Sequence, residues 1–192
     1  MKKLIVSLLT AMAVALTLGA NAHAGEFKGK FKFTSKAPKE DIFGTATGMA
    51  KLTSDPKDIS TLKGVITVPV ATMETGNSVR DDHLRSPTWL DAKAYPEITF
   101  TIETVKPDGP VKEEKGMKAA TVVVSGKFSL HGVTTPLKAK GIVKWKDDGK
   151  AKISTKFNIA LADYNVTGKA GIVGSKVGTT IACEATLVGT LK

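Results

Sequence analysis

The stretch ATVVVSGKFSLHGVTTPLKAKGIVKW, residues 120–145, decides the fold. In both of its halves apolar residues alternate with polar ones, which is the period of a strand that buries one face. The apolar positions are Ala120, Val122, Val124, Phe128, Leu130, Leu137, Ala139, Val143 and Trp145. Between the halves, HGVTTP at 131–136 holds a glycine and a proline and turns the chain. The stretch therefore predicts two antiparallel strands joined by a turn.

The same alternation recurs on both sides of this stretch. It predicts further strands at 26–34, 43–52, 62–70, 98–106, 153–161 and 177–191. We expect a mobile hairpin loop at 107–118 and a flexible glycine-rich connection at 163–174. Eight runs in mostly hairpin order, each with one apolar face, predict an all-β fold that closes into an eight-stranded antiparallel barrel.

A barrel of this size either fills with its own side chains or holds one slender ligand. Four glycines, Gly64, Gly126, Gly141 and Gly189, fall at inward positions where a filled core would have bulk. They indicate either a cavity or points at which strands bend. The sequence leaves both interpretations open.

The first residues have the pattern of a secretory signal peptide. A basic start at 1–3 is followed by an apolar run at 4–18 and by AHA at 22–24. We expect residues 1–24 to be cleaved on export to the periplasm and residues 25–192 to form one domain. Cys183 is the single cysteine, which predicts no internal disulfide, and a small buried role is favoured over a reactive thiol.

The net charge of +10 comes mainly from lysines at every second residue, as in Lys28, Lys30 and Lys32. This spacing is typical of the solvated face of a sheet. Nucleic-acid binding would call for arginines and aromatic residues interleaved on one face, so no nucleic-acid partner is expected. A transient attraction to anionic lipid at a membrane surface remains open.

One segment, SVRDDHLRSPTWLD at 78–91, breaks the alternation. Asn77 or Ser78 can cap a helix whose first turn is acidic. Ser86–Pro87 can start a second helical turn. The sequence therefore predicts a short helical cap between the third and fourth strands, covering one end of the barrel.

Both arginines of the chain lie in this cap. Arg80 and Arg85 can converge on an anionic or carbonyl head group, because a guanidinium group gives directed hydrogen bonds. They can equally pair with neighbouring aspartates and hold the cap in place. His83 can donate a hydrogen bond to a ligand or serve a structural role. We take Arg80, His83 and Arg85 as the candidate head-group residues.

The sequence favours no catalytic or metal-binding role. His83 has near it the residue types of a hydrolase triad, but they crowd one segment without a nucleophile elbow or oxyanion loop; the neighbours are Asp81, Asp82, Ser78 and Ser86. His83 and His131 lie in separate elements, with no metal-ligand spacing. We expect no enzyme activity, no metal and no cofactor.

Several motifs resemble the YceI-like family of bacterial periplasmic proteins. They are RDDHLRS at 80–86, WLD at 89–91, YP at 95–96 and GKFSLHGVTTP at 126–136. The late order of strand, glycine-rich loop and strand across 157–177 is also similar. The opening departs from the family pattern, because 27–52 lacks the histidine that the family has near its first hairpin.

The resemblance implies a lipocalin-like barrel that binds a long polyisoprenoid, such as a quinone or a polyprenyl phosphate, as a periplasmic carrier or store. The candidate tail-binding residues are Phe31, Phe33, Ile66, Val68, Leu84, Trp89, Phe100, Val124, Phe128, Val143, Trp145, Phe157, Ile159 and Ile181. The alternative is a stress or interaction protein with a filled barrel and a basic docking surface. Homodimerisation stays open in both cases.

Overall fold

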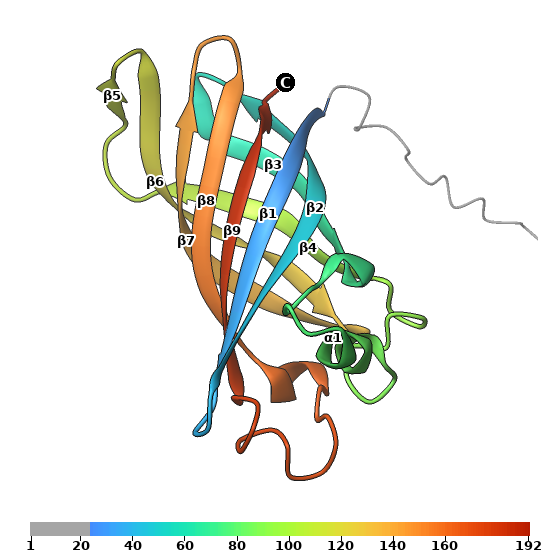
Figure 1. The fold of residues 1–192 in the computed structure, drawn as a ribbon. Coiled ribbons are helices and arrows are strands. Elements are labelled where there is room, and N and C mark those ends of the chain that lie inside the picture. The colour runs from blue at the N-terminus through green and yellow to red at the C-terminus, as the bar shows by residue number, and fades with distance from the viewer. Residues whose placement is uncertain (1–23) are drawn as a thin grey trace, which may run out of the picture.

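A computed structural model describes residues 24–192 (Figure 1). The elements are β1 (Gly25–Lys36), β2 (Asp41–Asp55), β3 (Asp58–Pro69), η1 (Val70–Thr72), α1 (Ser78–Arg85), β4 (Glu97–Pro107), β5 (Lys112–Glu114), β6 (Met117–Leu130), β7 (Val133–Trp145), β8 (Lys150–Ala160), η2 (Leu161–Tyr164) and β9 (Thr180–Thr190). The predicted signal peptide lies, apart from Ala24, outside the described residues. No helix between residues 24 and 192 is long and apolar enough to cross a membrane.

The strands form one antiparallel sheet in the order β4-β3-β2-β1-β9-β8-β7-β6-β5. An additional pairing of β4 with β6 closes this sheet into a barrel of eight long strands. The predicted eight-stranded barrel, with its helical cap between the third and fourth strands, is confirmed. The expected loop at 107–118 is corrected, because β5 pairs there with the start of β6.

The β6–β7 hairpin shows how the alternating sequence sets the register. Leu130 pairs with Val133, so the turn consists of His131 and Gly132 alone. Both have positive φ, 50° and 75°, as a two-residue hairpin turn with the twist of the strands requires. The turn is shorter than the predicted 131–136, because residues 133–136 already pair with β6.

The inward glycines divide into two kinds. A Cβ at Gly126 would overlap the carbonyl oxygen of Thr101 in β4, and Gly64 and Gly189 meet neighbouring backbone in the same way. Gly126 lies beside the irregular pairing between Ile102 and Thr104 in β4. Gly141 alone of the four lines an internal cavity. Close strand approach therefore accounts for three glycines and the cavity for one.

The two ends of the barrel differ. At one end, which carries the β2–β3 and β7–β8 turns, the interior is packed solid around Phe27, Leu52, Val143 and Trp145. The other end carries α1, the β1–β2 hairpin and the long β8–β9 connection (Figure 1). We call these the closed end and the mouth.

The helical cap at the mouth is shorter than predicted. Asn77 caps α1, and its side chain accepts a hydrogen bond from the Arg80 amide at 3.0 Å. The second predicted helical turn, at Ser86–Pro87, is instead a series of turns, because the Ser86 hydroxyl donates to the His83 carbonyl rather than capping a new helix. Leu90 anchors this segment against the barrel and is 5% exposed.

Candidate functional site

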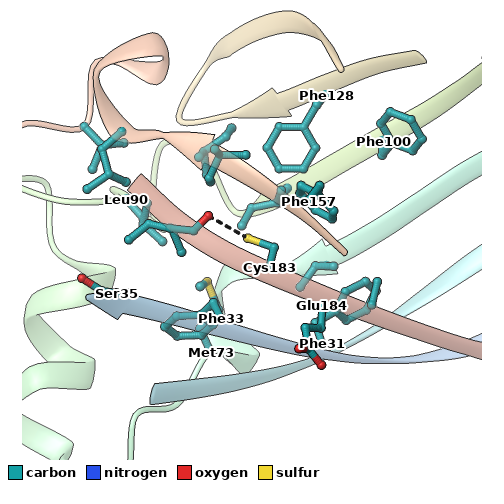
Figure 2. Close-up of a pocket in the computed structure, with 18 of the residues that line it drawn as sticks. Phe31, Phe33, Ser35, Met73, Leu90, Phe100, Phe128, Phe157, Cys183 and Glu184 are labelled. Atoms are coloured by element: carbon teal, nitrogen blue, oxygen red, sulfur yellow. Dashed lines mark hydrogen bonds between the residues drawn. The ribbon is translucent and has the colours of Figure 1, made fainter. Parts of the chain in front are cut away.

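A cavity of about 780 Å³ occupies the barrel between the closed end and the cap. This volume lies in the upper part of the ~300–1,000 Å³ range that is usual for ligand pockets. Phe100, Phe128 and Phe157 stand on its wall opposite Phe31 and Phe33 of β1 (Figure 2). The wall is overwhelmingly apolar, so it suits a hydrocarbon chain. The barrel is hollow rather than filled.

The structure brings together almost all of the predicted tail residues. Those that line the cavity are Phe31, Phe33, Ile66, Val68, Leu84, Trp89, Phe100, Val124, Phe128, Val143, Phe157, Ile159 and Ile181. They come from seven of the eight long strands, all except β2, and from the cap. The alternating pattern is the signal that identified the strand residues, because it separates inward from outward positions.

Trp145 is the predicted tail residue that does not line the cavity. It ends β7 within the packed closed end, where it is 2% exposed. Its indole Nε1 donates a hydrogen bond to the Pro56 carbonyl in the β2–β3 turn at 2.9 Å. Trp145 therefore seals the base of the barrel below the cavity.

Two of the three predicted head-group residues lie at the mouth. Arg80 and His83, both on α1, line the cavity there. Arg85 does not, because its guanidinium group donates to the Met73 carbonyl at 2.9 Å and lies 3.7 Å from Asp82. Arg85 thus ties α1 to the chain that precedes it.

Arg80 is held at the mouth by hydrogen bonds to Thr75. Its Nε donates to the Thr75 hydroxyl at 2.9 Å and its second amino group to the Thr75 carbonyl at 3.1 Å. The remaining amino group forms an ion pair with Glu40 of the β1–β2 hairpin at 3.4 Å. Arg80 therefore connects two elements of the mouth, and its side chain stays 34% exposed. The aspartates expected to pair with it do not supply these contacts.

Asp81 is buried beneath this network. Its carboxylate accepts hydrogen bonds from the Thr75 amide at 2.7 Å and from the Thr75 hydroxyl at 2.5 Å. These hydrogen bonds, chiefly the one from the hydroxyl, hold the pKa of Asp81 below its ordinary value, with smaller contributions from Arg85 and Arg80. Among the described residues, no hydrogen bond joins the His83 ring to the candidate acids and hydroxyls, so they are not connected as a catalytic triad is; these are Asp81, Asp82, Ser78 and Ser86.

Sequence reasoning missed the loops that complete the mouth. Lys39 and Glu40 in the β1–β2 connection line it, as do Ile172 and Lys176 in the β8–β9 connection. Loop residues carry no periodicity, so the sequence does not predict whether their side chains point inward or outward. Topology was the available signal, because in an up-and-down barrel every second connection lies at the same end.

Cys183 lies on the cavity wall, in the middle of β9 (Figure 2). Its thiol lies 3.8 Å from the Ile181 carbonyl oxygen, and burial raises its pKa to about 12. A thiol with so high a pKa has almost no reactive thiolate at neutral pH. Cys183 is half-buried rather than fully buried, because it faces the cavity, and its high pKa agrees with the expectation that it is not a reactive thiol.

Comparison with known proteins agrees with this architecture. A family profile described as the YceI-like domain matches residues 14–188. The protein YceI of Escherichia coli O157:H7 and a UPF0312 protein of Pectobacterium carotovorum are each 32% identical over 137 residues, 69% of this chain. The match spans 66% of the length of each of these relatives, just under two thirds.

Solved structures share the fold. BcnA of Burkholderia cenocepacia has a TM-score of 0.71 and 22% identity, over 84% of this chain and 96% of that one. A polyisoprenoid binding domain from Saccharophagus degradans has a TM-score of 0.68 and 16% identity, over 88% and 99%. At these identities the likeness concerns the fold, whereas the profile covers most of the sequence. The chain therefore belongs to the YceI-like domain family.

Proposed function

We propose that this protein binds one long-chain amphiphilic isoprenoid, with the tail inside the barrel and the head group at the mouth. The single observation that carries the proposal is the apolar cavity of about 780 Å³, which opens beside Arg80. The related barrel from Saccharophagus degradans is described as a polyisoprenoid binding domain, which supports the same class of ligand here. The role is binding, without catalysis.

Affinity comes from the tail. Each methylene group that leaves water for the cavity contributes about 0.8 kcal/mol, so even a few isoprene units outweigh a single hydrogen bond of about 1 kcal/mol. Phe100, Phe128 and Phe157 form an aromatic patch on the cavity wall that offers contact to the tail. Tail length then contributes more than head-group chemistry to how tightly the ligand is retained.

Orientation comes from the mouth. Most of the hydrogen-bond donors of Arg80 already contact Thr75 and Glu40. Arg80 therefore offers a ligand a fixed positive charge rather than a free pair of donors. Lys39 and Lys176 line the same opening, and no carboxylate of residues 24–192 lies within 4.0 Å of either ammonium group. A carbonyl or phosphate head group, as in a quinone or a polyprenyl phosphate, fits this setting.

The basic and apolar segments at 1–24 support export, and we place the protein in the periplasm, where it carries or stores its ligand. A carrier in an aqueous compartment must hide the tail completely. The cap contributes to this, because Leu84, Trp89 and Leu90 line the cavity at the mouth.

The test is organic extraction and mass spectrometry of the protein purified from its own host. We expect one isoprenoid per protein, and its mass distinguishes a quinone from a polyprenyl phosphate. Arg80→Ala should lower the retained amount several-fold and leave the barrel folded. Lys127→Ala is the matched control, because it breaks a similar ion pair, 3.5 Å from Glu103, on the outside of β6.

The proposal would be contradicted if the protein purified from its own host yielded no stoichiometric lipid. If Arg80→Ala and Lys127→Ala retain the same amount as the wild type, the tail site stands but Arg80 has no part in holding the head group.

A further inference from the structure

The positive charge of the barrel gathers on one side. Strands β7, β8, β9 and β1 lie next to one another and run side by side across the front of Figure 1. Besides Lys36 near the mouth, six exposed lysines on their outward side have no carboxylate oxygen within 4.0 Å in the described part of the chain, whereas the outward carboxylates of these four strands are Glu26 and Glu184. We call these six lysines the lysine face: Lys28, Lys30, Lys32, Lys138, Lys144 and Lys152.

The other side of the barrel is balanced. The outward positions of β2, β3 and β4 carry Lys51, Lys63 and Lys106, and also Asp41, Glu97 and Glu103. Solubility requires charge on all sides, but it does not require this segregation. Solvation of the sheet therefore does not by itself explain the lysine face.

Strand register places these charges in rows. Lys144 pairs with Lys152, Lys152 with Val188, and Val188 with Lys28, so one row crosses four strands. Neighbouring strands lie about 4.8 Å apart, well within a Debye length of ~8 Å, so the lysines of a row act on a partner together. Placing like charges side by side costs stability in the free protein. A polyanionic surface would relieve that repulsion.

Apolar side chains lie between the charged rows. Val188, which belongs to the row just described, is 55% exposed. Ile142, two residues before Lys144 on the same face of β7, is 46% exposed. Both would remain in water in a free monomer. An interface that offers anionic groups and, just beneath them, hydrocarbon satisfies both features at once.

We infer that the lysine face docks the barrel, side-on, onto the surface of an anionic phospholipid bilayer. Lipid phosphates diffuse laterally and can match a rigid array of lysines, whose ammonium groups act as point charges without a fixed hydrogen-bond geometry. Val188 and Ile142 then enter the head-group region. Docking does not depend on the occupant of the cavity.

The same face suits a nucleic acid poorly. Both arginines of the chain lie on α1, so the face has no guanidinium fork to grip a phosphate or a base edge. Its outward positions hold no aromatic ring on which bases could stack. The exposed valine and isoleucine would gain nothing from a soluble polyanion.

Vesicle co-sedimentation of the full protein tests the inference. We expect the protein to bind phosphatidylcholine vesicles that contain about 30 mol% phosphatidylglycerol, to ignore pure phosphatidylcholine, and to be released as salt rises. The variant Lys28→Gln/Lys144→Gln/Lys152→Gln should lower the partition coefficient by about two orders of magnitude, since each lysine near such a surface contributes about fivefold. Thermal unfolding should confirm that it is folded.

The matched control is Lys51→Gln/Lys63→Gln/Lys106→Gln, which removes the same charge from the balanced side and should bind nearly as well as the wild type. Equal loss in both triple variants would overturn the inference, because net charge alone would then explain binding. A third variant, Ile142→Ser/Val188→Ser, should weaken vesicle binding several-fold at unchanged charge. If it binds unchanged, Ile142 and Val188 do not enter the head-group region and that part of the inference is wrong. If the wild type binds a soluble polyanion such as heparin but no vesicle, the bilayer is not the partner.

Discussion

Thr75 is the residue on which the polar contacts of the cap converge. Its hydroxyl donates to the Asp81 carboxylate and accepts from the Arg80 Nε, so one short hydrogen-bonded chain joins the two charged groups. Its amide donates to the same carboxylate. The position of Arg80 at the mouth therefore depends on Asp81 being ionised, although Asp81 does not line the cavity.

This dependence gives a pH prediction. The folded protein holds the pKa of Asp81 below its ordinary value of 3.8, so the carboxylate stabilises the fold fully above that pH and loses its effect as pH falls further. Asp81→Asn should lower the free energy of unfolding by about 1–2 kcal/mol at neutral pH, through loss of a charged acceptor. The difference from the wild type should shrink below pH 3.8. Urea unfolding across this range measures both.

Asp82→Asn is the control for this prediction. Asp82 is the next residue of α1, but its side chain is 83% exposed and only approaches Arg85 at 3.7 Å. An exposed pair of this kind contributes at most about 1 kcal/mol. A wild-type advantage over Asp81→Asn that does not change with pH would show that the carboxylate charge is not what Thr75 recognises.

At the scale of the element, glycines mark where strands approach too closely for a side chain. The β6–β7 hairpin shows both kinds, since Gly126 on β6 faces the backbone of β4 and Gly141 on β7 lies on the cavity wall. The first glycine is there for contact between strands. The second leaves room inside the barrel.

We expect Gly126→Ala to destabilise the protein by about 1–3 kcal/mol, because the new methyl group must displace the Thr101 carbonyl and disturb the β4–β6 pairing that closes the barrel. Gly141→Ala is the comparison. Its Cβ would come no closer than 3.1 Å to the Ser154 carbonyl oxygen, so we expect a change within about 1 kcal/mol. Denaturant unfolding of both variants measures the difference, and equal losses would contradict the assignment.

The strands were predictable from the sequence, and the loops were not. Period-two alternation determines both where β6 and β7 run and which of their residues face inward, so Val124 and Phe128 were correctly placed on the interior side. Lys39 and Lys176 belong to connections without a period, and only tertiary packing directs them to the mouth. Arg85 shows the same limit, because the Met73 carbonyl that holds it lies outside the helix and carries no sequence signal.

At the scale of the molecule, the centre of this barrel lacks the packed side chains that form the core of most globular proteins. Two apolar clusters remain, one at the closed end and one beneath the cap, with the cavity between them. A ligand that fills the cavity restores the missing contacts and, because it binds the folded state, raises stability by mass action. On our proposal the tail is thus part of the core.

Filling the cavity with protein should therefore separate stability from binding. Ala139→Leu adds a larger side chain to the cavity wall on β7, and we expect it to stabilise the lipid-free protein by about 1 kcal/mol while lowering the amount of isoprenoid retained several-fold. Ala182→Leu adds the same atoms to an exposed position of β9 and should change neither quantity appreciably. Thermal unfolding after extraction, with mass spectrometry of the extract, gives both readouts on each variant. If Ala139→Leu stabilises the empty barrel but the protein still retains lipid at the wild-type level, the tail does not occupy this part of the cavity.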